Sequence, residues 1–185
     1  MKKQNQVETT NQIFYSFEYF CTNKNNIQAF LSARAVAEQS RDIENPLYIY
    51  GSTRTGKTHI LYAIEQYINE HKPEVNVVRV SSVDYVEEVI DAIKTRKVNE
   101  LRKKYRSADV LLVDDIDFLA NKELSMEEFH HLFNTLYEGG KLIVITGNAS
   151  PRELMKEGLS EKLVSRLEWG KIVEIPFEDQ KANEK

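Results

Sequence analysis

A glycine-rich segment in the first third of the chain carries residues whose types and spacing suit phosphate binding. Positions 51–58 read Gly-Ser-Thr-Arg-Thr-Gly-Lys-Thr, which fits the pattern G-x-x-x-x-G-K-[ST] at every fixed position. The two glycines allow backbone turns that let successive N–H groups face phosphate oxygens. The lysine can reach the β- and γ-phosphates, and the last hydroxyl is a ligand for Mg²⁺. We therefore predict that a nucleotide is bound by Gly51, Ser52, Thr53, Arg54, Thr55, Gly56, Lys57, Thr58 and His59.

The segments on either side of this loop have the patterns of a strand and a helix. Residues 46–50 form a short apolar run that predicts a buried strand, and apolar residues recur at helical spacing over 57–71. The order of strand, loop and helix aims the N-terminus of the helix at an anion. The alternative, an ordinary glycine turn, is disfavoured by these flanking patterns.

A second set of candidates follows an apolar strand pattern at 110–114. Asp114 ends this run and Asp115 comes next. Ligands of parallel sheets lie beyond the carboxyl ends of the strands, where both side chains emerge. We expect Asp114 to hold Mg²⁺ opposite Thr58, and Asp115 to orient or deprotonate an attacking water. The alternative is that these aspartates only begin a turn.

Two further residues are catalytic candidates together with Asp115. Asn148 follows the apolar run at 142–146 and could touch the γ-phosphate or its water, or it could be a turn residue before Pro151. Arg166 lies at the end of a helical pattern. It could be a finger that reaches the γ-phosphate of a neighbouring subunit, although a surface arginine is the simpler interpretation from the residues alone.

Strand and helix patterns alternate along the chain and predict an α/β sandwich of three layers around a five-stranded parallel sheet. Two helices in succession, 83–94 and 97–106, precede the third strand, and Ser125 with Glu128 suggests a capping box at the start of a later helix. We expect a disordered tail at 1–12, one domain at 13–177 and a short tail at 178–185. The predicted strands are 46–50, 75–80, 110–114, 142–146 and 172–175, and the other helices are 25–39, 57–71, 125–137 and 159–167.

Composition limits the class of protein. The chain has 185 residues, of which 41% are hydrophobic, and a formal net charge of −4. One core is expected, and a generally basic nucleic-acid binder is excluded. Cys21 is the single cysteine, so no internal disulfide is possible, and we expect a small buried apolar side chain in a cytoplasmic protein. There is no secretory signal and no apolar run of about 20 residues, so we expect no contact with a membrane.

Taken together, these motifs resemble the AAA+ ATPase domain of the bacterial replication initiator DnaA family. The resemblance extends from about residue 14 to residue 175. It implies binding of ATP or ADP with Mg²⁺, and weak hydrolysis that needs a neighbouring subunit. Further matching stretches are 15–20 (Tyr-Ser-Phe-Glu-Tyr-Phe), 105–116, 127–130, 133–136 and 165–170.

The resemblance also implies a role for particular residues. Asn148 falls at the position called sensor 1, and Arg166 at the arginine finger, which acts across a subunit boundary. The two successive helices look like the insertion specific to initiators. The strip that packs on adenine is implied at 20–26, with Cys21, Thr22 and Asn26 as its candidate contacts.

Departures from the family pattern leave other functions open. Arg54 stands where a glycine is usual in the loop, Lys162 replaces a second arginine, and Leu124 replaces a basic residue that helps to hold single-stranded DNA. In the family, the small helical lid would begin near 177–180, and the given sequence ends at Lys185. The alternatives are a non-catalytic relative that regulates the initiator by protein interaction, or a helicase-loader ATPase.

The expected partners are an adenine nucleotide and either a second copy of the chain or a full-length initiator. The insertion carries a basic patch, which is either an ordinary solvated helix face or a weak site for single-stranded DNA. His130 and His131 are adjacent on a helix, so we expect them to pack at the edge of the core rather than to bind metal. The basic patch consists of Arg96, Lys97, Arg102, Lys103, Lys104 and Arg106.

Overall fold

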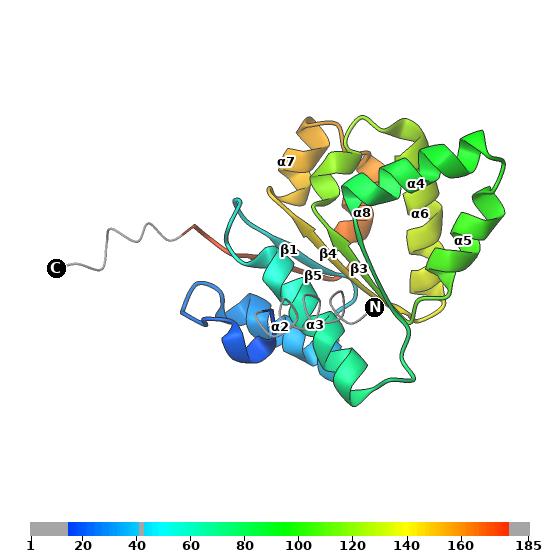
Figure 1. The fold of residues 1–185 in the computed structure, drawn as a ribbon. Helices are drawn as coiled ribbons and strands as arrows, with labels where there is room; N and C mark the ends of the chain where they lie inside the picture. The colour runs from blue at the N-terminus through cyan, green and yellow to red at the C-terminus, as the bar shows by residue number, and fades with distance from the viewer. Residues whose placement is uncertain (1–14, 41–42, 178–185) are drawn as a thin grey trace, which may run out of the picture.

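The computed structural model describes residues 15–40 and 43–177. Five parallel strands form one sheet in the order β2-β3-β4-β1-β5 (Figure 1). The predicted parallel α/β architecture is therefore confirmed. The strands are β1 Leu47–Tyr50, β2 Val77–Ser81, β3 Val110–Asp114, β4 Leu142–Gly147 and β5 Lys171–Glu174.

Helices cover both faces of the sheet, which gives three layers (Figure 1). The 3₁₀ turn η1 and helices α2 and α3 pack on one face, and the remaining helices pack on the other. On the first face lie η1 Phe17–Tyr19, α2 Ile27–Glu38 and α3 Lys57–His71. On the second lie α4 Ser82–Lys94, α5 Val98–Arg106, the 3₁₀ turn η2 Ile116–Leu119, α6 Glu123–Glu138, α7 Pro151–Lys156 and α8 Glu161–Leu167.

Successive side chains of a strand point to opposite faces of the sheet, and both faces are covered by helices. This explains why the strand sequences are apolar throughout. In β3, Leu111 and Val113 join the core beneath α4 and α6, whereas Val110 and Leu112 join the core beneath α2 and α3. All four side chains are fully buried. Both faces of the strand are therefore covered, as in other parallel sheets, and its carboxyl end is left as the place where polar side chains can emerge.

Helices α4 and α5 form the two-helix insertion between β2 and β3. Helix α4 begins directly after β2, and the Ser81 hydroxyl caps it by accepting the Asp84 N–H at 3.1 Å. The buried Tyr105 of α5 anchors the pair, since its hydroxyl donates to Glu88 of α4 at 3.0 Å. The turn between the helices passes through Arg96, which has a positive φ of 58°.

Some local predictions were wrong. Helix α6 begins at Glu123, and Ser125 lies buried inside it instead of capping it. A capping box is instead formed by Ser150 and Glu153 at α7, a helix that was not predicted. Cys21 is exposed rather than buried. The tails predicted at 1–12 and 178–185 lie outside the described residues.

Candidate nucleotide site

The predicted phosphate loop connects β1 to α3, at the carboxyl edge of the sheet. A side chain at Gly51 would collide with the carbonyl oxygen of Ile175, which follows the neighbouring strand β5. Gly56 caps α3 with a φ of 95°, in the left-handed region that favours glycine. Gly51 is thus required by the close approach of the Ile175 backbone, and Gly56 by its left-handed conformation. The N-terminus of α3 faces the loop.

The residues between the two glycines differ in their burial and conformation. Ser52, Thr53 and Arg54 are exposed, while Thr55 is half-buried and donates its hydroxyl to the Ser52 carbonyl at 2.9 Å. Arg54 has a φ of 67°, a left-handed conformation that is uncommon for a residue with a side chain. Arg54 therefore has a backbone conformation that glycine would favour.

Lys57 is the most buried cation of the site, with only 5% of the residue exposed. Its ammonium donates to the carbonyl oxygens of Gly51 and Ser52, at 2.6 and 2.8 Å. Burial lowers the pKa of Lys57, and the carboxylates of Asp115, then Asp117 and Asp114, oppose this shift. The loop thus holds a buried positive charge beside several carboxylates.

Asp114, the last residue of β3, is hydrogen-bonded to both α3 and β4. One of its carboxylate oxygens accepts the hydroxyl of Thr58 at 2.9 Å, and the other accepts the hydroxyl of Thr146 at 2.5 Å. The fold therefore brings Thr58 and Asp114, which are 56 positions apart in sequence, into direct contact. Oxygen ligands of this kind are what Mg²⁺ takes when it is also held by phosphates.

Asp115 lies next to this contact, in a left-handed conformation with a φ of 53°. Its backbone N–H donates to the Thr146 hydroxyl at 3.0 Å, which fixes the turn after β3. Partial desolvation raises the pKa of the Asp115 carboxyl, the Asp114 carboxylate raises it further, and the Lys57 ammonium opposes both. The side chain itself remains open to solvent. This combination suits a group that takes up a proton from water.

Asn148 is exposed in the turn that follows β4. Its backbone N–H donates to both carboxylate oxygens of Asp117, at 2.9 and 3.0 Å, and its side-chain amide donates to one of them at 3.3 Å. Asn148 is thus held at the same edge as Asp114 and Asp115, with its side chain turned toward η2.

Thr146 and Asp117 are site residues that sequence reasoning missed. Thr146 is fully buried, and its hydroxyl links Asp114 to the turn at Asp115. The available signal was a threonine at the end of an otherwise apolar strand pattern at 142–146. Asp117 gave a weaker signal, because it stands three residues after Asp114 in a turn whose shape the sequence does not specify.

The predicted adenine strip runs beside the end of the loop. The Phe20 ring comes close enough to Gly56 that an added Cβ there would lie 3.0 Å from it. Asn26 is buried and donates its amide to the Cys21 carbonyl at 2.9 Å, which holds the strip in a compact turn, whereas Cys21 and Thr22 are exposed. Two of the three candidate contacts of the strip, Cys21 and Thr22, are thus available to solvent.

His59 does not point its ring at the loop. Its Nε2 lies 2.8 Å from the Ser16 carbonyl oxygen, and its ring packs edge-on against Phe20 and Tyr15. The imidazole therefore ties α3 to the segment that leads into the adenine strip. We expected His59 among the nucleotide contacts, and in this structure its side chain is committed to that packing.

Arg166 lies on α8, in the layer of helices above the second face of the sheet (Figure 1). Its guanidinium donates through Nε to the side-chain oxygen of Asn134 on α6 at 2.9 Å and stacks 4.0 Å from the centre of the Trp169 ring. No hydrogen bond joins Arg166 to the phosphate loop in the described part of the chain. The structure thus groups the loop, Asp114, Asp115 and Asn148 together, and Arg166 with α6.

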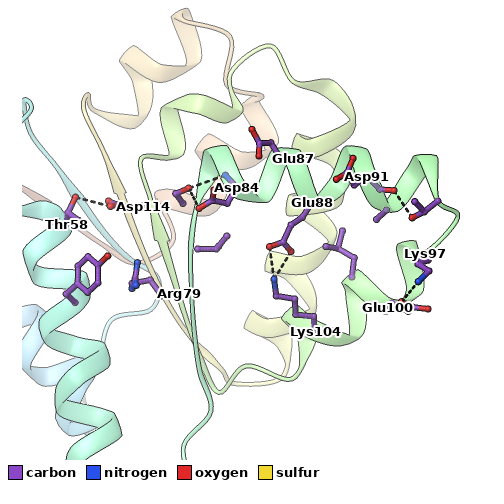
Figure 2. Close-up of a pocket in the computed structure, with 16 residues that line it drawn as sticks. Thr58, Arg79, Asp84, Glu87, Glu88, Asp91, Lys97, Glu100, Lys104 and Asp114 are labelled. Carbon is purple, nitrogen blue, oxygen red and sulfur yellow. Dashed lines mark hydrogen bonds and ion pairs between the residues drawn. The ribbon is translucent and has the colours of Figure 1, made fainter. Parts of the chain in front are cut away.

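A groove of about 930 Å³ leads from Thr58 and Asp114 along α4 to the turn before α5. Figure 2 shows Asp84, Glu87 and Asp91 along its α4 wall. Three cations of the insertion are paired within the chain, which reduces the charge available to a nucleic acid. These pairs are Lys97 with Glu100 at 3.6 Å, Arg102 with Glu128 at 2.6 Å and Lys104 with Glu88 at 2.7 Å.

No cluster of three or more histidine, cysteine, aspartate or glutamate side chains is arranged to hold a metal ion within residues 15–40 and 43–177. A cation at this site would therefore depend on Thr58, Asp114 and oxygens of a phosphate chain. Among the helices of the same residues, none has the length and apolar character needed to cross a bilayer.

Comparison with known proteins decides the family. Residues 11–174 match the family described as "Bacterial DnaA ATPAse domain". The chain belongs to this family. The resemblance that the sequence motifs indicated is thereby confirmed.

Individual relatives agree with this assignment. The chain is 42% identical to the chromosomal replication initiator protein DnaA of Roseiflexus castenholzii over 165 residues, which cover 89% of the chain and 34% of the relative. The structure of AMPPCP-bound DnaA from Aquifex aeolicus has a TM-score of 0.82 and 37% identity, and the match covers 88% of this chain and 50% of that one.

A structure described as the replication initiator DnaA bound to AMPPCP and single-stranded DNA gives a TM-score of 0.83 at 36% identity, covering 89% of this chain and 50% of that one. The chain spans about a third of the length of the curated DnaA relatives that it matches, 34% in the case above. It corresponds to the ATPase domain of those proteins.

Proposed function

We propose that this DnaA-family chain binds an adenine nucleotide together with Mg²⁺, and that residues 13–177 form the unit that binds it. The observation that carries the proposal is the meeting of Thr58 and Asp114 at 2.9 Å, directly beside the loop that contains the buried Lys57. Relatives bound to the ATP analogue AMPPCP support the same ligand class. The residues present fit a magnesium nucleotide because a hydroxyl and a carboxylate oxygen converge where the phosphates would lie.

Each residue of the site has a role in this proposal. Backbone N–H groups of the loop and the Lys57 ammonium bind the phosphate oxygens, and the exposed strip at Cys21 and Thr22 packs on the base. Thr58 and Asp114 would hold Mg²⁺, which neutralises charge on the β- and γ-phosphates when it is bound.

Hydrolysis requires further residues. Asp115 orients the attacking water and receives its proton, and its raised pKa suits this role. Asn148 faces the same edge and contacts the γ-phosphate or the water. Arg166, which contacts α6 instead of the loop, supplies its charge to the nucleotide of a second subunit. Hydrolysis is therefore weak in a single chain and increases when chains associate with one another or with a full-length initiator.

The alternative of a helicase-loader ATPase is less favoured, because the matched family is that of the DnaA ATPase domain. Single-stranded DNA is the weaker candidate partner, although a relative binds it. In this chain, Leu124 is an exposed apolar residue and the neighbouring Glu123 is acidic. Together with the three paired cations of the insertion, they reduce the positive charge that is offered to the phosphates of a nucleic acid.

The binding proposal is tested by calorimetric titration with Mg-ATP. Lys57→Ala removes the buried ammonium and should weaken binding by about 2–3 kcal/mol, the scale of a charge-assisted hydrogen bond. Lys72→Ala is the matched control, because it removes a lysine at the opposite end of α3 and should leave the affinity unchanged. Equal ATP affinity in the Lys57→Ala variant and the unmodified chain would contradict the proposal.

A further inference from the structure

The surroundings of Arg166 differ from those of the chain's structural arginines. Arg34, Arg79 and Arg102 each donate to a glutamate at 2.6 Å, which neutralises the guanidinium charge. Arg166 instead donates to the uncharged amide of Asn134, and it has no carboxylate partner within residues 15–40 and 43–177. The charge of Arg166 is therefore oriented without being neutralised.

Two contacts fix the plane of this guanidinium. The Nε–H donates to Asn134 at 2.9 Å, and one face lies on the Trp169 ring at 4.0 Å from its centre. Neither Nη group has a hydrogen-bond partner within residues 15–40 and 43–177, so both can act together as a two-donor fork. Trp169 follows the end of α8 and is 46% exposed, so the ring on which the guanidinium lies is accessible from outside the chain.

The amide of Asn134 is itself oriented by a second contact on α6. Its Nδ2 lies 3.5 Å from Nε2 of His130, one helical turn earlier. Because the amide nitrogen is a donor, this contact requires a neutral His130 whose Nε2 accepts. With Nδ2 facing His130, the amide oxygen is the atom that faces Arg166.

The charges around His130 favour this neutral form. Burial lowers the pKa of His130, and Arg166, His131 and Lys162 lower it further, with Glu127 as the opposing charge. The orientation of Asn134 is thus maintained at neutral pH by a histidine that the guanidinium itself helps to keep uncharged.

We propose that Asn134 is a positioning residue for Arg166, holding the guanidinium through Nε so that the Nη fork is presented to the nucleotide of a second subunit, and that His130 sets the orientation of the Asn134 amide. This inference rests on the proposed role of Arg166. Misplacement of a reacting or stabilising group by about 1 Å can cost on the order of 100-fold in rate. We therefore expect Asn134→Ala to lower the turnover of associated chains by ten- to a hundredfold without changing the affinity for ATP.

The positioning itself is tested by NMR of the arginine side chains. The Nε–H of Arg166, assigned by its loss in Arg166→Lys, should exchange slowly in the unmodified chain and rapidly in Asn134→Ala. Asn134→Asp should restore slow exchange because a carboxylate accepts the same proton. Thr135→Ala, a truncation of an exposed neighbour on α6, should leave the signal unchanged. Equal exchange rates in Asn134→Ala and the unmodified chain would overturn the inference.

The role of His130 has its own readout in the same experiment. When the pH falls through the pKa of His130, Nε2 becomes a donor, and the Asn134 amide must turn its oxygen toward it. The Arg166 Nε–H should then lose its protection in the unmodified chain but keep it in Asn134→Asp, whose carboxylate can accept from both groups. Protection that does not change as His130 titrates would remove His130 from the proposal.

Turnover measured against protein concentration separates this inference from the proposed function. If the unmodified chain shows no turnover that rises with concentration, the proposed role of Arg166 fails, while the exchange measurements still decide whether Asn134 orients it. If turnover rises with concentration and Asn134→Ala lowers it while Asn134→Asp retains the NMR signature, the inference stands. Full turnover in Asn134→Ala would refute it.

Discussion

Arg54 offers the sharpest test of the phosphate loop, because its backbone and its side chain have separable effects. A left-handed conformation costs a residue with a Cβ about 1–2 kcal/mol, and Arg54 adopts it with a φ of 67°. Glycine removes this cost but adds about 0.4–1 kcal/mol of entropy to the unfolded chain. Arg54→Gly should therefore raise the free energy of unfolding by about 0.5–1 kcal/mol, or the melting temperature by about 1–4 °C.

The side chain of Arg54 is exposed, and we expect it to make a modest contact with a phosphate. An exposed ion pair is worth ~0.2–1 kcal/mol, so its loss should weaken ATP binding by about 1.4- to fivefold and leave adenosine binding unchanged. Arg54→Ala separates the two effects, because alanine keeps the backbone cost and removes the charge. This variant should have the stability of the unmodified chain and the lower affinity of Arg54→Gly.

Arg96 provides a matched control, since it is an exposed arginine with a φ of 58° in the turn between α4 and α5. Arg96→Gly should stabilise the chain about as much as Arg54→Gly and leave ATP affinity unchanged. Thermal unfolding and calorimetric titration of the four proteins decide the matter. Tighter ATP binding by Arg54→Gly and Arg54→Ala would show that the side chain obstructs the site, and our reasoning about a phosphate contact would be refuted.

Three other predictions concern single side chains. Thr146→Val should destabilise the fold by about 1–3 kcal/mol in chemical denaturation, because two partly buried hydrogen bonds of a buried threonine are lost; Thr146→Ser should restore them. Asp115 has a raised pKa, so its ionisation opposes folding: stability should fall as pH rises from near 4 through the folded pKa, and Asp115→Asn should flatten that dependence. A pH–stability profile shared by both proteins would contradict this. Arg166→Ala should leave ATP affinity unchanged and abolish turnover that rises with protein concentration; turnover independent of concentration would show that each chain supplies its own site.

The sequence predicted those parts of the fold that depend on local pattern. Buried strands such as β3 are continuously apolar, and the loop before α3 has a fixed spacing of glycine and lysine, so both could be located. The start of α6 was misplaced because Ser125 and Glu128 match a capping box in sequence, whereas the helix begins two residues earlier at Glu123 and buries Ser125. The side-chain contacts were harder to predict.

Thr146 and Asn134 show why those contacts could not be predicted. Each is a polar residue in an element with an apolar pattern, and its role depends on a partner that lies 32 positions away in sequence. No local pattern states which partner the fold will bring near. The resemblance to a family located Arg166, but only the packing of α8 on α6 reveals the amide that holds it.

The hydrogen bonds of the buried Lys57 ammonium affect how the loop distinguishes one phosphate ligand from another. Because two carbonyl oxygens of the loop already accept from Lys57, a phosphate must exchange with them rather than meet an unoccupied donor. The gain from such an exchange is the difference between two sets of hydrogen bonds, so a ligand with few anionic oxygens gains little. Selectivity for longer phosphate chains would thus arise from competition within the loop, and the number of phosphates would matter more to binding than the identity of the base.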